Sequence, residues 1–349
     1  MKSARLTPLT LLCVGLLAGL AACAPADPTR LVLMTHDSFA VSEDLLEAFE
    51  DRHGVMLDVL RAGDAGAMVN QAILTRDAPL ADVLFGVDNT FLSRALEADI
   101  FVPYPAAAGE NIPAELRLGG ELATPIDYGD VCVNYDREFF EASAPAPRSI
   151  EELAEAAQRS RLVVENPATS SPGLAFLLAT IVRFGEQGEY TWRDYWADLV
   201  ANDVLVVAGW EEAYYGSFSG GAGAGDRPLV VSYATSPVAE VFLADPQPEQ
   251  APTGVINDGC FRQVEFAAVL RGTRQPQLAG RLIEYLLSAE VQADIPLDMF
   301  VFPAVSGIEP PPLFVQHAVA VREPLTMDPA TIAANRERWI EEWTDVVLR

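Results

Sequence analysis

Histidine and cysteine are scarce in this 349-residue sequence, which has three of the first and four of the second. They do not follow a zinc-binding spacing, so a catalytic metal is not expected. Basic residues are also few, with 23 lysines and arginines against 50 aspartates and glutamates and a formal net charge of −27. Such a charge repels nucleic acid and anionic lipid headgroups. It would favour a cationic ligand, although acidity of this kind equally suits a saline or acidic habitat.

The apolar stretch Leu9–Leu20 is too short to cross a bilayer, which takes about 20 residues. It follows a basic start and ends in small residues before Cys23, a layout typical of an export signal. The four residues that end at Cys23, Leu-Ala-Ala-Cys, resemble the lipobox of bacterial lipoproteins. That resemblance implies cleavage before Cys23 and a lipid on its sulfur. An ordinary secretory signal ending near Ala22 or Ala24 is the alternative, and either signal predicts export.

Export bears on the other cysteines. Cys13 would leave with the signal peptide and Cys23 is the candidate for lipidation, so Cys132 and Cys260 remain. Both lie in strand-like runs, and an exported protein occupies a compartment in which disulfides persist. The sequence is compatible with a disulfide between Cys132 and Cys260 and also with two buried free thiols.

Strand-like runs alternate with helix-like patterns, restarting near Arg161, and this alternation predicts an α/β fold with a largely parallel sheet. Trp339 and Trp343, on the last helix, are expected to pack in the core. The expected strands are 29–35, 55–60, 83–87, 127–135, 161–165, 204–207, 229–233 and 260–270. The expected helices are one opened by Ser42, 67–74, 91–98, one from Ile150, 174–184, one from Thr235, 276–288 and 328–347.

Polar turns follow two of the expected strands. They are His36-Asp37-Ser38 and Asp88-Asn89-Thr90. In parallel sheets, ligands bind beyond the carboxyl ends of the strands. Helix capping is the alternative role for such residues. Because several polar turns converge at these ends, we expect a ligand site there.

Seven segments in register resemble the thiamine-binding periplasmic proteins of ABC importers, over about residues 30 to 348. No one of these segments is specific by itself. They are 35–39 (THDSF), 82–89 (DVLFGVDN), 127–129 (DYG), 166–173 (NPATSSPG), 209–214 (GWEEAY), 232–237 (SYATSP) and 339–343 (WIEEW).

The resemblance implies a two-lobed periplasmic binding protein, type II-like, with hinge strands between the lobes. Residues 1–22 would be the signal peptide and 23–30 a lipid-anchored tether. Lobe 1 would comprise 31–128 and about 261–349, with C-terminal helices that can span both lobes, and lobe 2 would comprise 129–260. Cys132 and Cys260 would then lie on neighbouring hinge strands, which favours the disulfide.

The resemblance also implies polar ligand contacts. Asp64 and Asp88 match acidic positions suited to the donors of an aminopyrimidine or to a cationic thiazolium. Ser170 and Ser171 match a turn before a helix, where backbone N–H groups favour a phosphate or the hydroxyethyl end of thiamine. Ser236 would add a hydroxyl contact.

Aromatic contacts are implied at Trp210 and Tyr233, whose ring faces attract a flat cation. Two positions depart from the family pattern. His36, beside Asp37 in its polar turn, stands where the family has tyrosine, and a protonated imidazole would disfavour thiazolium and favour phosphate. Phe300 stands where tryptophan is familiar and lacks the indole N–H.

The implied function is capture of thiamine, or of its phosphate or pyrophosphate, and delivery to an ABC permease with its ATPase subunit. No cofactor is expected, and the membrane would be reached through the lipid anchor alone, in the periplasm. Another small cation, such as a polyamine or ferric iron, is the alternative ligand, although the adjacent residues Tyr214 and Tyr215 would diverge by about 100° on a helix. A thiaminase-like enzyme using Cys132 or Cys260 as nucleophile is a further alternative.

Overall fold

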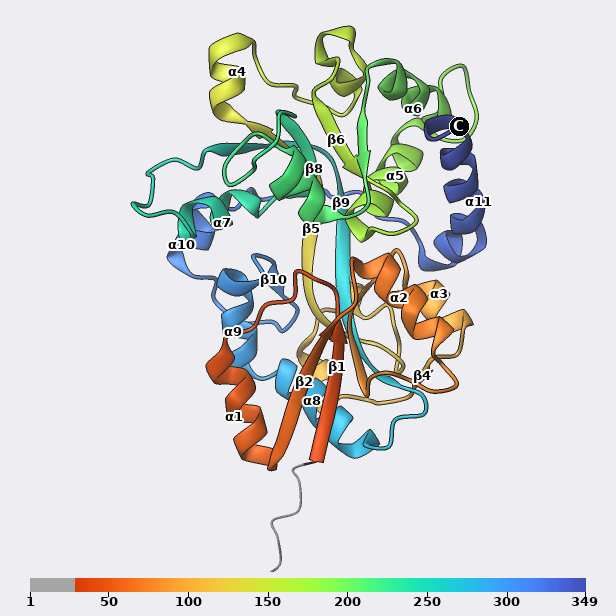
Figure 1. The fold of residues 1–349 in the computed structure, drawn as a ribbon, viewed down its shortest axis with the longest axis vertical. Helices are drawn as coiled ribbons and strands as arrows, with labels where there is room; N and C mark the ends of the chain where they lie inside the picture. The colour runs from red at the N-terminus through yellow and green to blue at the C-terminus, as the bar shows by residue number, and fades with distance from the viewer. Residues whose placement is uncertain (1–28) are drawn as a thin grey trace, which may run out of the picture.

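The computed structural model describes residues 29–349, so the expected signal peptide and almost all of the expected tether lie outside the described residues. Within this range the chain forms two lobes, seen at the bottom and the top of Figure 1. A single sheet runs through both lobes in the order β2-β1-β3-β9-β5-β8-β6-β7. No helix of residues 29–349 is long and apolar enough to cross a membrane.

The lower lobe starts with alternating strands and helices. β1 pairs in parallel with β2 on one side and with β3 on the other, as the strand-like runs predict. The elements are β1 (Thr29–Thr35), α1 (Glu43–His53), β2 (Val55–Arg61), α2 (Ala65–Leu74), β3 (Val83–Asp88), α3 (Leu92–Glu97), β4 (Phe101–Val102), α8 (Pro276–Leu286), α9 (Ala289–Asp298) and β10 (Phe302–Pro303).

The upper lobe repeats this arrangement on a smaller scale. β6 pairs in parallel with β7 and with β8, and the nearly all-apolar helix α5 is buried along most of its length. The elements are α4 (Arg137–Ser143), β6 (Leu162–Glu165), α5 (Ser171–Phe184), α6 (Trp192–Ala201), β7 (Leu205–Val207), β8 (Leu229–Tyr233), α7 (Ser236–Phe242) and α10 (Pro312–His317).

Two long strands, β5 (Thr124–Asp136) and β9 (Thr253–Leu270), run side by side through the middle of the molecule and connect the lobes (Figure 1). They are antiparallel to each other, and each is antiparallel to its outer neighbour, β8 or β3. The expectation of a largely parallel sheet therefore holds for the outer strands and is wrong for the centre. The cause is connectivity, because β5 enters the upper lobe and β9 leaves it.

The prediction of a helix from Ile150 is wrong. Only two short 3-10 turns form there, at Glu151–Ala154 and Ala156–Gln158. The side-chain amide of Asn202 donates to the carbonyls of Ala154 and Glu155, and Tyr195 donates its hydroxyl to the carbonyl of Ile150. These tertiary hydrogen bonds satisfy the carbonyl groups that a continuing helix would use. β9 also begins seven residues earlier than the run from Cys260 suggests.

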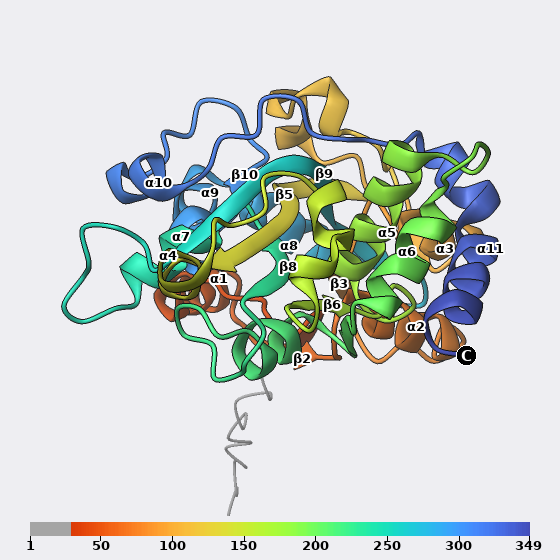
Figure 2. The ribbon, with the colours of Figure 1, turned by 90° about the horizontal axis from the view of Figure 1, so that it is seen from above.

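The last helix, α11 (Pro329–Val347), packs against α6 of the upper lobe and against α3 of the lower lobe (Figure 2). Trp339 and Trp343 are both buried, which confirms the expectation that they belong to the core. The rings of Trp343 and Trp196 meet edge to face, with their centroids 5.5 Å apart. The helix therefore forms a second connection between the lobes beside the two crossing strands.

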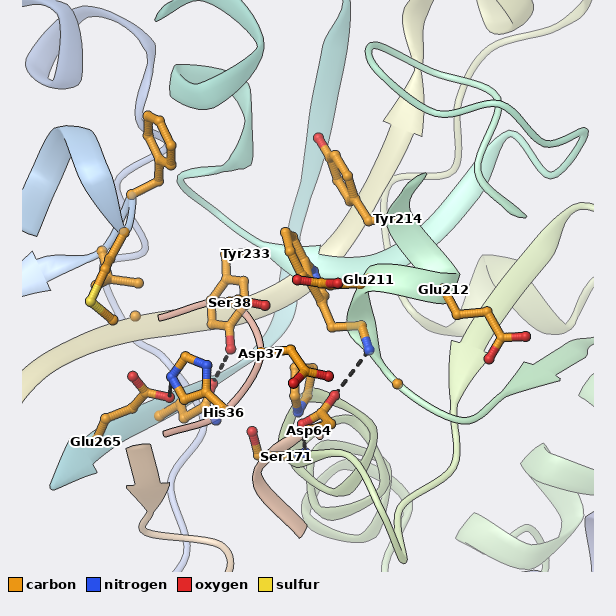
Figure 3. A pocket seen from close by; sticks show the side chains of 18 of the residues that line it. His36, Asp37, Ser38, Asp64, Ser171, Glu211, Glu212, Tyr214, Tyr233 and Glu265 are labelled. Carbon is orange, nitrogen blue, oxygen red and sulfur yellow. Dashed lines mark hydrogen bonds and ion pairs between the residues drawn. The ribbon is translucent and has the colours of Figure 1, made fainter. Parts of the chain in front are cut away.

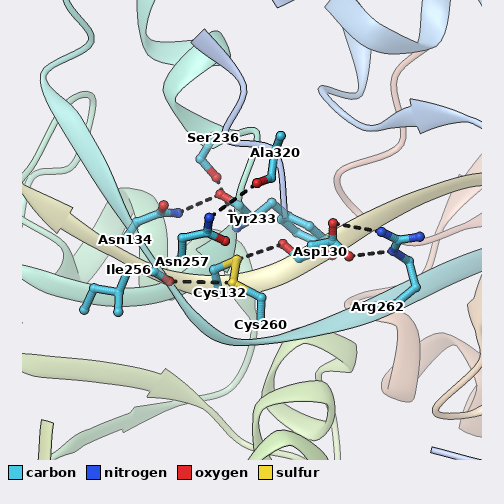
Figure 4. The surroundings of a disulfide bond; sticks show 10 residues. All are labelled: Asp130, Cys132, Asn134, Tyr233, Ser236, Ile256, Asn257, Cys260, Arg262 and Ala320. Atoms are coloured by element: carbon cyan, nitrogen blue, oxygen red, sulfur yellow. Dashed lines mark hydrogen bonds and ion pairs between the residues drawn. A yellow bond between two sulfur atoms is a disulfide. The ribbon is translucent and has the colours of Figure 1, made fainter. Parts of the chain in front are cut away.

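A disulfide joins Cys132 on β5 to Cys260 on β9, with the Cα atoms 4.4 Å apart (Figure 4). Both cysteines are 2% exposed. The strand register around them is irregular, because Val131 pairs with Phe261 whereas Val133 pairs with Ile256. The bridge thus ties the two crossing strands together at the point where their ladder is interrupted.

We predict that the double substitution Cys132→Ser, Cys260→Ser lowers the free energy of unfolding by about 2–4 kcal/mol, because the bridge limits the freedom of the unfolded chain. Chemical denaturation of residues 29–349 measures this loss. A thiol assay on the denatured, unreduced wild-type domain should find no free thiol. Two reactive thiols in that assay would contradict the disulfide.

Candidate ligand-binding cleft

A cleft of about 520 Å³ lies between the lobes, against the two crossing strands (Figure 3). The lower lobe contributes the turns that follow β1 and β2, and the upper lobe contributes the start of α5 and the segment after β7. The lining residues are His36, Asp37, Ser38, Gly63, Asp64, Ala67, Asp127, Gly129, Thr169, Ser171, Pro172, Ala208, Gly209, Trp210, Glu211, Glu212, Tyr214, Tyr215, Tyr233, Ser236, Ala239, Gln263, Glu265, Met299, Phe300 and Val301.

The charged lining of the cleft is acidic. It includes six carboxylates and one histidine, and neither lysine nor arginine is among the lining residues. Carboxylates gathered in a recess of low dielectric raise the local concentration of cations. No group of three His, Cys, Asp or Glu side chains in residues 29–349 is placed to hold a metal ion. The carboxylates are those of Asp37, Asp64, Asp127, Glu211, Glu212 and Glu265.

Asp64 links the two lobes. It caps α2 by accepting the N–H of Ala65 at 2.6 Å, and it also accepts the N–H groups of Trp210 at 2.9 Å and Ser171 at 3.3 Å from the upper lobe. Burial raises the pKa of its carboxyl group, although these N–H donors act in the opposite direction. The N–H of Ser171, at the turn that resembles an anion site, thus already has a carboxylate partner. Ser170 is fully buried behind it and does not line the cleft.

Aromatic rings form one wall of the cleft. The Trp210 ring lies 5.2 Å from that of Tyr214 and 6.4 Å from that of Tyr233, measured between centroids. Hydrogen bonds fix two of these rings, since Trp210 donates its indole N–H to Ser232 at 2.9 Å and Tyr233 donates its hydroxyl to Gln263 at 2.7 Å. Such fixed ring faces suit a flat cation.

The two adjacent tyrosines have different surroundings. Tyr214 is buried and donates its hydroxyl to Glu240 at 2.8 Å, whereas Tyr215 is exposed. Their rings lie at 82° to each other. The segment is a π-helix, Glu212–Ser217, and the hydroxyl of Tyr214 already has Glu240 as its partner.

Asp88 does not line the cleft, although the sequence placed it among the ligand contacts. Its carboxylate is fully buried and accepts hydrogen bonds from Thr90 and from the side-chain amide of Gln263 at 3.0 Å. Gln263 in turn accepts the hydroxyl of Tyr233. Asp88 therefore helps to position Tyr233 of the aromatic wall through Gln263. Burial raises its pKa to about 7.

The structure brings together eight of the ten residues that the resemblance implied: His36, Asp37, Asp64, Ser171, Trp210, Tyr233, Ser236 and Phe300. Sequence reasoning missed Asp127, Gln263 and Glu265, which project from the two crossing strands. The available signal was a charged or amide residue inside a strand, because such a residue is rarely buried unless it has a partner or a ligand.

The family model for bacterial extracellular solute-binding proteins matches residues 78–324. The chain belongs to this family. It is 30% identical to the thiamine-binding periplasmic protein of Salmonella typhimurium, over 98% of this chain and 98% of the relative. It is also 30% identical to the thiamine-binding periplasmic protein of Escherichia coli, over 91% of this chain and 94% of that protein.

The solved structure of a periplasmic thiamin binding protein has the same fold. The two superpose with a TM-score of 0.81 at 29% sequence identity, covering 92% of this chain and 96% of the other. The two-lobed architecture that the sequence predicts is therefore confirmed, and the chain is a substrate-binding protein of a transport family.

We predict that Asp88→Asn flattens the pH dependence of stability. The pKa of Asp88 is about 7 in the folded protein and lies near its ordinary value of 3.8 in the unfolded chain, so the folded state binds more protons between these values. Wild-type stability should then fall as pH rises from about 4 to about 7, and asparagine removes this contribution. Denaturation of the ligand-free protein at pH 5 and pH 8 should show a drop smaller by at least about 1 kcal/mol in the variant. Equal drops in both proteins would contradict the assignment.

Proposed function

We propose that this solute-binding protein captures thiamine in the cleft and delivers it to an ABC permease, which an ATPase subunit drives. The observation that carries the proposal is a cleft with an aromatic wall, six carboxylates and neither lysine nor arginine in its lining. Thiamine combines a cationic thiazolium ring with a flat aminopyrimidine, and such a cleft matches both. Two relatives at 30% identity carry thiamine binding in their names.

The proposed contacts follow from the positions of the side chains. Trp210, Tyr233, Phe300 and His36 would flank the two rings of the ligand. Carboxylates and hydroxyls around them would hold its cationic and hydrogen-bonding groups, with Asp37, Asp64, Ser171 and Ser236 as the candidates. A phosphate group at the turn before α5 would compete with Asp64 for the N–H of Ser171. Thiamine phosphates are therefore secondary candidates.

Closure of the lobes would signal that the ligand is bound. In this proposal, the lower lobe moves relative to the upper lobe around the crossing strands, and the permease binds the closed form. Asp64 would favour closure, because it already accepts N–H groups from the opposite lobe.

Catalysis is not part of the proposal, and no cofactor is needed for capture. The thiaminase-like alternative requires a thiolate nucleophile. Cys132 and Cys260 are joined in a buried disulfide, so neither is a free thiol. The other cysteines belong to residues 1–28, outside the described residues.

We predict that Trp210→Ala and Tyr233→Ala each weaken thiamine binding at least about tenfold, because each removes a ring face from the cation. Isothermal titration calorimetry of the purified domain measures the change. Tyr190→Ala is the matched control, since Tyr190 lies outside the cleft on the surface beside α6. Wild-type affinity in both cleft variants would remove these rings from the site.

The same calorimetry should rank thiamine above thiamine phosphate, thiamine pyrophosphate, spermidine and ferric citrate for the wild-type protein. Tight binding of spermidine or ferric citrate together with no binding of any thiamine form would overturn the proposed ligand class.

We also propose periplasmic location with a lipid anchor on Cys23. The wild-type full chain, produced in a Gram-negative host, should fractionate with membranes, and Cys23→Ser should appear in the soluble periplasmic fraction. Recovery of the wild-type protein in the soluble fraction would contradict the lipid anchor and favour an ordinary secretory signal.

A further inference from the structure

Three acidic residues lie in a row across the centre of the sheet. In the strand register, Glu265 on β9 is directly opposite Asp127 on β5 and directly opposite Asp88 on β3. Directly opposed residues of antiparallel strands have side chains on the same face, and like charges in such pairs destabilise the sheet. Asp88 has hydrogen-bond donors of its own, whereas neither carboxyl oxygen of Asp127 has a hydrogen-bond partner in residues 29–349.

Asp127 and Glu265 both line the cleft, and Asp127 is fully buried. Burial, together with the negative charge of Glu265, raises the pKa of Asp127 well above its ordinary value. Two negative charges at opposed positions of this pair repel each other, so a bound proton or a nearby cation stabilises it.

His36 contacts Glu265 of this pair from the lower lobe. Its Nε2 atom lies 3.4 Å from Oε1 of Glu265 (Figure 3). The ring is held against β3, where a Cβ at Gly86 would lie 2.1 Å from Cδ2 of His36, so glycine leaves the space that the imidazole fills. Burial by itself lowers the pKa of His36, but Glu265, Asp64 and Asp37 outweigh it and raise the pKa above 6.5.

We propose that His36, Glu265 and Asp127 form a proton-holding array that releases a proton to solvent when the cationic ligand enters the cleft. This inference rests on the proposed function, because it takes thiamine as the ligand. The cation replaces the proton as the positive charge that offsets the two carboxylates. No covalent bond to the ligand forms or breaks, and the proton passes from the array to water or buffer.

The charges around the array decide the direction of the pH dependence. Those that face it are Asp37 and Asp64 from the turns of the lower lobe and Asp88 from β3, all acidic, and the neutral hydroxyl of Tyr233 from β8. A cation beside the array lowers its proton affinity in the complex. Thiamine affinity should therefore rise with pH, by roughly threefold to tenfold per unit from about pH 6 to about pH 8.

Calorimetry in buffers with different enthalpies of ionisation counts the protons exchanged on binding. Wild-type protein titrated with thiamine at pH 7 should release about one proton per ligand bound. The double variant His36→Gln, Asp127→Asn keeps similar side-chain shapes and should bind thiamine with release of less than about 0.2 proton. Its affinity should also vary little with pH.

Glu211→Gln is the matched control, because it removes one negative charge from the same cleft at an exposed position outside the array. It should bind thiamine more weakly and still release as many protons as the wild type. Two results would contradict the proposed array. One is thiamine binding by the wild type without proton release, and the other is equal proton release by the wild type and the double variant. Absence of any thiamine binding contradicts the proposed function and this inference with it.

Discussion

The pairing of β5 with β9 is the constraint on which the rest of the structure depends. These strands are antiparallel over more than ten residue pairs and pass through both lobes. Their register places Asp127 beside Glu265 on the cleft floor and brings Cys132 within bonding distance of Cys260. A shift by one residue would turn every side chain of a strand to the opposite face and remove both features.

The carboxylates of the cleft differ in their surroundings from most charged residues in the described part of the chain. Elsewhere most of the arginines in the described part of the chain lie in ion pairs, as between Arg262 and Asp130 or Arg338 and Glu186. In the cleft, Asp127 is fully buried beside Glu265, and neither lysine nor arginine is among the lining residues. Buried carboxyls in this state destabilise the ligand-free protein, and binding sites commonly retain such unfavourable arrangements because a ligand relieves them.

Much of the site was accessible from the sequence because it lies in short polar or aromatic turns. His36 follows β1 and Asp64 precedes α2. Ser171 begins α5, and Trp210 lies in the segment after β7. Ligand contacts are expected at such positions in α/β folds. Asp127 and Glu265 were not accessible in this way. They lie within long strands, and only the pairing of segments more than 130 residues apart shows that they face each other.

Local patterns determined the lobes' strands and helices, the acidic charge and the two cysteines available for a bridge, because these depend on neighbours along the chain. The helix predicted from Ile150 does not form because distant residues intervene. Asn202 and Tyr195 donate hydrogen bonds to carbonyl groups that a helix there would have used. Tertiary structure alone decided which strands became antiparallel, which acids met and which of them faced the cleft. Those outcomes depend on register and burial, which arise only when distant segments pack together.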